Sequence, residues 1–227
     1  MASTRRACEA IVALALAAGV VAPTAAGAID RAAGLAALQQ AAHAAVEARL
    51  TALSGAVTAI SASTFMGADQ AAITTMLQGD ITGLTALDAK IQADTTLVDA
   101  RNDTQTIYTD YRVFALVLPV AHMTRAADVL VKLVIPHLTT AEGKLQTAIT
   151  AKGATALQPL LDDMKTQTAA AAQLAGALPA ALVGLKPADW NANHEVLGAD
   201  RTALETARAD VRKARQDARQ IIDGLRK

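Results

Sequence analysis

The chain is poor in cysteine and in aromatic residues. Its 227 residues include one cysteine, one tryptophan, two tyrosines and two phenylalanines. A single cysteine excludes an internal disulfide framework, so packing has to stabilise the fold. The shortage of aromatic residues argues against a β-sandwich, because strands are enriched in aromatic and β-branched side chains. The formal net charge is zero, which argues against a protein-wide field directed at nucleic acid.

The sequence also lacks the short motifs of common catalytic and cofactor sites. It contains no P-loop, no dinucleotide-binding glycine motif, no HExxH zinc motif and no CxxCH haem motif. The Glu-x-x-His signature of di-iron bundles is absent as well. We therefore predict that the protein is not an enzyme, and that it has no cofactor and no bound metal.

The first 28 residues have the pattern of a signal peptide. Arg5 and Arg6 give a positive start, Ile11–Val21 is an uncharged apolar run, and Ala26–Ala28 offers the small residues that a signal peptidase requires. The apolar run is shorter than the roughly 20 residues of a membrane-spanning helix. We predict that this leader, which includes Cys8, is cleaved and that the protein is secreted or held in the cell envelope.

The remaining residues, 29–227, predict an all-α fold. Alanine, the strongest helix former, dominates their apolar content. Apolar residues recur at helical spacing, which predicts an elongated antiparallel helical bundle of five or six helices. The predicted helices cover residues 29–62, 69–94, 97–149, 155–185 and 194–227, with a loop at 186–193. Apolar residues at spacings of three, four and seven predict coiled-coil-like seams. One is formed by Val46, Leu50, Leu53, Val57 and Ile60, and the other by Leu197, Leu204, Val211, Ala218 and Leu225 with Ala207, Ala214 and Ile221 at the companion positions.

The stretch 97–149 is the predicted spine of the bundle. Pro119 and Pro136 each remove a backbone hydrogen bond, and a kinked helix is favoured over two separate ones. Val113–Ala121 is free of charged residues, which predicts a turn enclosed on every side. Polar side chains interrupt the apolar run too often for a membrane span: His122, Arg125, Asp128 and Lys132. The spine could be shared by two tandem three-helix bundles, or it could belong to one compact bundle.

A polar cluster beside the apolar run is the first candidate site. Asp110, Tyr111, Arg112 and His122 lie close together in the sequence. A structural role is favoured for them, with the tyrosine ring buried and the charged groups paired to neighbouring helices. The alternative is a small-ligand or metal carrier that uses the bundle core near Tyr111 and His122. A metal pair of His43 and Glu47 is a weaker possibility, because a usable site needs three or four ligands.

A cationic edge on the last helix is the second candidate site. It consists of Arg201, Arg208, Arg212, Arg215 and Arg219, which follow the apolar seam. Residues 200–227 have a net charge of +3 and residues 69–128 a net charge of −4. The simplest interpretation is that these segments face each other and pair within the bundle. A polyanionic wall polymer is the alternative partner, although no aromatic residue lies in the strip to support it.

Two stretches carry a resemblance. Asp110–Val113, followed by Pro119 and His122, and Pro187–Asn193, leading into Ala207–Arg212, resemble an uncharacterised family of exported, alanine-rich helical proteins of high-GC actinobacteria. The resemblance covers roughly residues 80–227. It implies the helical fold and the exported location, and it implies no activity and no site residues.

These observations favour a non-catalytic secreted or cell-envelope protein with a structural or interaction role. Its long helical faces would bind a protein partner or a second copy of the chain. No specific nucleic acid and no transmembrane segment are expected after cleavage of the leader.

Overall fold

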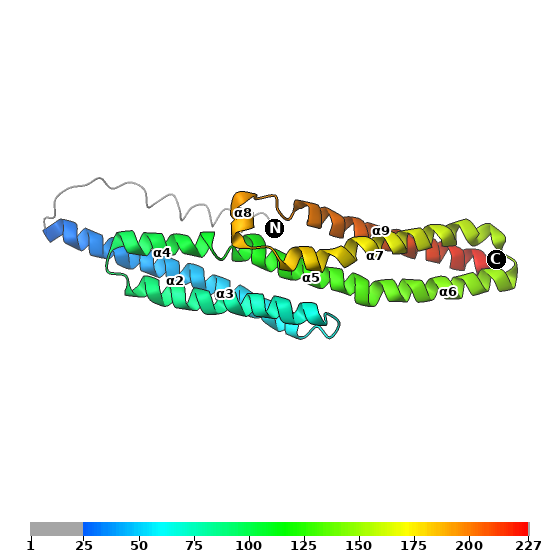
Figure 1. Cartoon of the computed structure of the whole chain (residues 1–227), viewed down its shortest axis with the longest axis horizontal. Helices are drawn as coiled ribbons and strands as arrows, with labels where there is room; N and C mark the ends of the chain where they lie inside the picture. Colours follow the sequence, from blue (N-terminus) through cyan, green and yellow to red (C-terminus); the bar gives the residue numbers. More distant parts are fainter. Residues whose placement is uncertain (1–24, 227) are drawn as a thin grey trace.

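The computed structural model describes residues 25–226 of the chain, with the side chains of residues 31–226. Most of the predicted leader, residues 1–24, lies outside the described residues, and its predicted cleavage point falls in the first turn of helix α2 (Ala25–Ser61). Every regular element of the described part is helical, and the long helices run along one long axis (Figure 1). The prediction of an elongated all-α bundle is confirmed.

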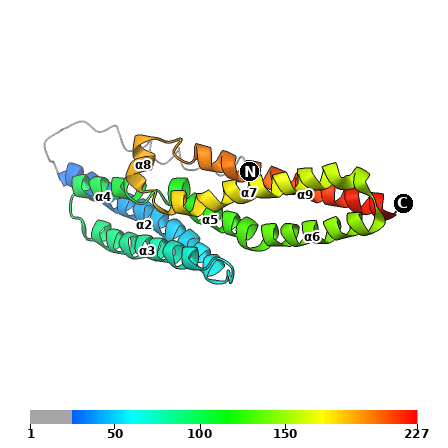
Figure 2. The same cartoon turned by 45° about the vertical axis from the view of Figure 1, so that its right-hand side comes forward.

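The helices form two groups of three that share the predicted spine. The elements after α2 are α3 (Ala68–Ala93), α4 (Leu97–Thr109), π-helical turn η2 (Val113–Val117), α5 (Leu118–Val129), π-helical turn η3 (Leu130–Val134), α6 (Ile135–Lys152), 3-10 turn η4 (Thr155–Leu157), α7 (Gln158–Val183), α8 (Pro187–Ala192) and α9 (Gly198–Arg226). Helices α2, α3 and α4 pack together at one end, and α6, α7 and α9 at the other, with α5 between them (Figures 1 and 2). Whether these groups are two tandem three-helix bundles or parts of one compact bundle stays a prediction.

Both prolines of the spine lie inside continuous helix. Pro119 and Pro136 are each preceded by a π-helical turn, η2 and η3. In an α-helix the proline ring meets the carbonyl four residues earlier, and the wider π turn accommodates it. The spine is interrupted elsewhere, at Asp110–Arg112, where Arg112 has φ 43° and ψ 36°. The stretch Leu97–Lys152 is apolar and long enough to cross a membrane, but 56% of its most apolar window is buried inside the bundle.

The structure corrects two boundaries near the C-terminal end. The predicted loop 186–193 contains the short helix α8, whose first turn is stabilised by the Lys186 amide donating to Asp189 Oδ2 at 2.8 Å. Proline at its first position is typical of a helix start. Helix α9 begins at Gly198 rather than at residue 194, because Asn193 Oδ1 caps a turn by accepting the Glu195 amide.

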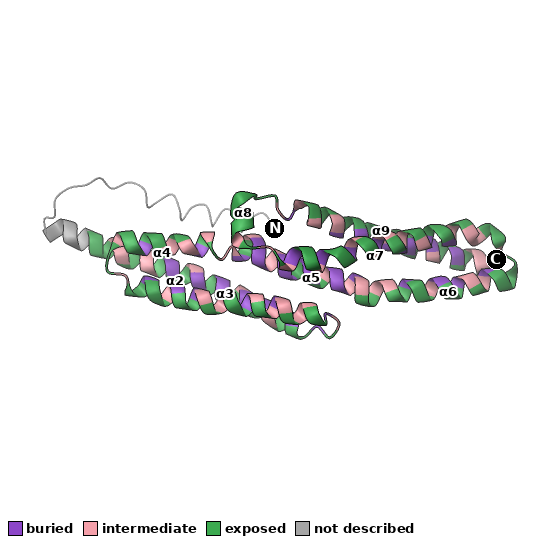
Figure 3. Ribbon diagram, viewed as in Figure 1, coloured by how far each residue is buried: buried purple, intermediate pink, exposed green. Residues whose placement is uncertain are grey.

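The predicted seams form the core. In Figure 3 the buried positions follow the inner side of each long helix. On α2, Val46, Leu53 and Ile60 are buried, and the other two seam residues, Leu50 and Val57, are half-buried. The C-terminal seam is buried in the same way, through Leu197, Leu204, Ala207, Val211, Ala214 and Ile221. Alanine at these positions lets helix axes approach closely, and α9 packs most extensively against α7.

Candidate functional site

The two helix groups meet at the interruption of the spine. Arg112, in the left-handed region, directs its Nε toward Asn191 of α8 and donates to Asn191 Oδ1 at 2.6 Å. The Asn191 amide nitrogen in turn donates to the carbonyl of Thr109 at 2.9 Å. A non-glycine residue in this conformation is strained and persists only where its surroundings hold it. The structure thus joins the two sequence stretches that carry the resemblance.

Four of the five aromatic residues of the chain gather at this junction: Tyr108, Tyr111, Phe114 and Trp190. The guanidinium of Arg49 on α2 lies 4.7 Å from the ring centre of Tyr108 and 5.3 Å from that of Phe114. Phe114 is 50% exposed. The prediction that residues 113–121 are enclosed on every side is therefore wrong, because the turn at Arg112 sends the Phe114 ring outward over Arg49.

An open groove of about 590 Å³ lies on the outer side of the junction. The side chains of Arg112, Phe114, Trp190 and Arg201 line it, together with His194 and Glu195. The rings of Trp190 and His194 are 5.7 Å apart, centre to centre. The groove therefore combines two arginines with two aromatic side chains in one lining, a composition suited to an anionic ligand.

The cationic ridge, defined as Arg201, Arg208, Arg212, Arg215 and Arg219, continues from this groove along α9. All five side chains are exposed. The predicted pairing of these arginines with acids of residues 69–128 is not formed. Helix α9 packs mainly on α7 and α6, and α5 is the part of that stretch with which it packs. Within residues 31–226 none of the five makes a salt bridge; the acid buried on α9, Asp217, pairs with Lys213 instead, at 2.5 Å.

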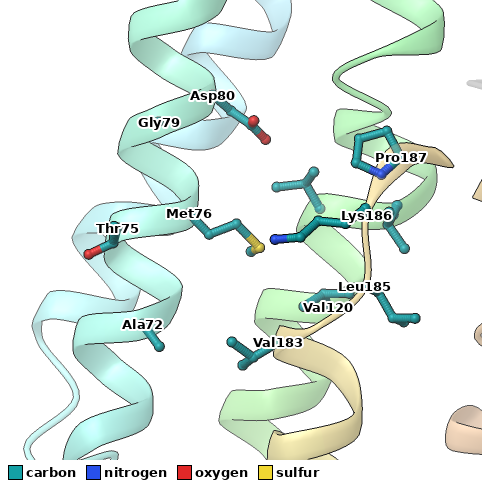
Figure 4. A pocket seen from close by; sticks show the side chains of 12 residues that line it. Ala72, Thr75, Met76, Gly79, Asp80, Val120, Val183, Leu185, Lys186 and Pro187 are labelled. Atoms are coloured by element: carbon teal, nitrogen blue, oxygen red, sulfur yellow. The ribbon is translucent and has the colours of Figure 1, made fainter. Parts of the chain in front are cut away.

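A second hollow, the inter-group cleft, lies on the inner side of the junction (Figure 4). It has a volume of about 370 Å³, and its apolar walls come from α3, from η2 and α5, and from the segment between α7 and α8. Asp80 and Lys186 are its two charged lining residues. Burial raises the pKa of the Asp80 carboxyl to about 6.

Neither Tyr111 nor His122 lines this cleft. The Tyr111 hydroxyl packs against Gly83 of α3, so closely that a methyl group on Gly83 would lie 2.5 Å from it. Burial, and next the nearby Asp80 carboxylate, raise the pKa of the Tyr111 hydroxyl. His122 is exposed and does not line the cleft. Of the two residues named for the carrier, His122 therefore lies on the solvent side of α5, outside this cleft.

The His43 and Glu47 pair is not the contact that the structure shows. His43 Nδ1 lies 2.8 Å from Asp88 Oδ2 of α3, and this hydrogen bond raises the pKa of His43. In the part of the chain that the structure describes, no three His, Cys, Asp or Glu residues converge as metal ligands.

The groove and the cleft contain residues that the sequence analysis did not select: Asp80, Trp190, Lys186 and Phe114. They come from segments up to about one hundred positions apart, which no local motif links. The scarcity of aromatic residues is the one signal that could have pointed to Trp190 and Phe114. No family model, curated protein or solved structure matches the chain.

Proposed function

We propose that the protein is a non-catalytic interaction protein of the cell envelope, and that it binds an anionic polymer along the cationic ridge. The observation that carries this proposal is the ridge itself: five exposed arginines on one helix without a salt-bridge partner in the described part of the chain. Internal pairing was the competing explanation, and none of the five forms a salt bridge with an acid of residues 31–226, either on α9 or on the helices packed against it.

The spacing of the ridge fits a repeating anion. Separations of seven, four, three and four residues keep the five guanidinium groups on one side of α9 over about 27 Å of helix. Guanidinium binds phosphate and carboxylate through two hydrogen bonds at a time. Between Arg201 and Arg219, Glu205 is the acid that lies on the same side of α9 as the arginines. The local charge therefore stays positive although the whole chain is neutral.

The groove adds aromatic side chains, which the cationic ridge itself does not contain. Trp190 and Phe114 are not on α9, yet they line the groove with Arg201, the first arginine of the ridge. A polymer end or a sugar unit could stack there while its anionic groups follow the ridge. The leader pattern and the resemblance to exported proteins support a phosphate-rich or uronate-rich wall polymer as the partner.

Removal of two arginines tests this proposal against a matched control. Arg208→Gln with Arg212→Gln should weaken binding of inorganic polyphosphate about tenfold or more at low salt. Arg101→Gln with Lys144→Gln removes the same charge from exposed positions off the ridge and should leave the affinity nearly unchanged. Equal effects of the two double variants on the dissociation constant would show that the ridge is not a site.

A small-ligand carrier is the second candidate function, and the inter-group cleft favours it. Its volume lies within the range of small-molecule sites, and it lies between two helix groups, where such sites are common. Native mass spectrometry of the protein purified from its own cells would show a bound small molecule. A mass equal to that of the bare chain would count against this function.

A further inference from the structure

The inter-group cleft has an apolar body and two charges of opposite sign. Met76 from α3 and Leu116, Val117 and Val120 from the facing wall form the apolar surface. Figure 4 shows the Asp80 carboxyl pointing into the cleft from α3 and the Lys186 side chain extending into it from the opposite side. The two groups form no salt bridge with each other, so each remains available to a ligand.

The Asp80 carboxyl is incompletely satisfied. Its Oδ2 atom is buried and accepts no hydrogen bond from the residues that the structure describes. A buried carboxylate oxygen without a donor is unfavourable, and a ligand that donates to it recovers this free energy. A ligand ammonium group provides both the hydrogen bond and the opposite charge.

We propose that the cleft binds a small zwitterion with an apolar body, of the class of α-amino acids with large apolar side chains. The ligand ammonium donates to Asp80, its carboxylate accepts from Lys186, and its side chain packs on Met76 and Leu116. This assignment rests on the carrier function proposed above and names its ligand class.

Other ligand classes fit the two charges less well. A neutral apolar molecule leaves the buried Asp80 oxygen without a donor. A simple amine places a second cation beside Lys186, and a simple carboxylate places a second anion beside Asp80. Only a zwitterion gives each group an opposite charge, and a cleft of about 370 Å³ holds an amino acid with a side chain as large as tryptophan.

The protonation of Asp80 sets the expected pH dependence. Two titratable groups lie near Asp80: Lys186 lines the same cleft, and the pKa of the Tyr111 hydroxyl is raised in part by the Asp80 carboxylate. Tyr111 stays neutral in the acidic range, since even a free tyrosine has a pKa of about 10 and burial raises the pKa of Tyr111 further. Since the pKa of Asp80 is about 6 in the free protein, affinity for the zwitterion should decline as the pH falls through this value.

Calorimetric titration with three matched ligands tests the assignment: phenylalanine, phenethylamine without the carboxylate, and phenylpropionate without the ammonium. Phenylalanine should bind wild type best. Asp80→Asn should weaken the binding of phenylalanine and phenethylamine about tenfold or more and leave that of phenylpropionate unchanged. Lys186→Met should weaken the binding of phenylalanine and phenylpropionate and leave that of phenethylamine unchanged. Asp110→Asn is the control, because this exposed carboxyl is outside the cleft lining.

A filled cleft provides an independent variant. The Cβ position of Gly79 has no atom within 4 Å, so Gly79→Leu should occupy the cleft, keep the helical circular dichroism and abolish phenylalanine binding. Binding that ignores Asp80→Asn and Lys186→Met would overturn the zwitterion assignment. A small molecule of another class found by native mass spectrometry would overturn the assignment and leave the carrier function standing. Absence of any bound molecule in both experiments would overturn the two together.

Discussion

The two helix groups use their charges in different ways. In the group of α2, α3 and α4, charged and polar side chains connect one helix to another: His43 contacts Asp88 at 2.8 Å, and Lys90 contacts Asp103 at 2.8 Å. In the group of α6, α7 and α9, the salt bridges lie within α9, and the ridge arginines extend into solvent. The salt bridges of the first group thus join neighbouring helices. In the second group the polar contacts between helices are hydrogen bonds, such as Lys165 Nζ to Gln146 Oε1 at 2.9 Å, and the ridge arginines form no salt bridge with the described residues.

This difference also separates stability from recognition. Helix α9 is joined to α7 by leucine and alanine packing, so its outer side is free to vary in charge without loss of the core. We expect substitutions on the seam of α9 to affect folding alone, and substitutions on its ridge to affect binding alone.

The largest effect is expected from a charge placed in the seam of α9. Leu204→Asp buries an unpaired carboxylate at a position that is 4% exposed, and it should destabilise the fold by several kcal/mol. Leu133→Asp, at a position that is 40% exposed, is the control and should shift the melting temperature little. Similar melting temperatures for the two variants would contradict the assignment of Leu204 to a buried seam.

Removal of one lysine from each group compares a buried ion pair with an exposed one. Lys213→Met leaves Asp217 buried without its partner and should destabilise by about 3–5 kcal/mol. Lys90→Met breaks an exposed pair with Asp103 and should change the free energy of unfolding little. Urea unfolding of both variants measures the difference, and comparable losses would show that Asp217 has other support.

Two glycines on α3 should respond to alanine in opposite directions. Gly83→Ala places a methyl group against the Tyr111 hydroxyl and should destabilise by about 1–3 kcal/mol. Gly79→Ala has open space and should stabilise the helix by about 0.5–1 kcal/mol. Thermal melts of the two variants decide whether Tyr111 is held against α3 as described, since a stabilising Gly83→Ala would mean that it is not.

A pH dependence of stability is expected from Asp80. Its pKa rises from 3.8 unfolded to about 6 folded, so the folded state retains this proton in the interval between them. The free energy of unfolding should therefore decrease as the pH rises from about 4 to 6, by about 1–2 kcal/mol once partial solvation is allowed for. Asp80→Asn should remove this decrease; an unchanged pH profile would mean that Asp80 titrates normally in the fold.

The helices and their buried sides were predictable because period and composition are local properties of the sequence. The neighbours of each helix were not predictable in this way. The net charges of the segments favoured α3 as a neighbour of α9, whereas apolar packing places α9 against α7. The turn at Arg112 could not be foreseen either, since Asn191, seventy-nine positions away, holds it. Helix α8 could have been predicted from the sequence, because proline at the first position with an acidic residue in the first turn, here Pro187 and Asp189, is typical of a helix start.

The most direct test of the proposed function is the salt dependence of polyphosphate binding by the wild-type protein and by the Arg208→Gln, Arg212→Gln variant. If the ridge binds the polymer, the logarithm of the association constant falls linearly with the logarithm of salt concentration, and the variant loses roughly one unit of slope for each arginine removed. An association constant that is indifferent to salt, or a slope that is the same in both proteins, would contradict a ridge built for an anionic polymer.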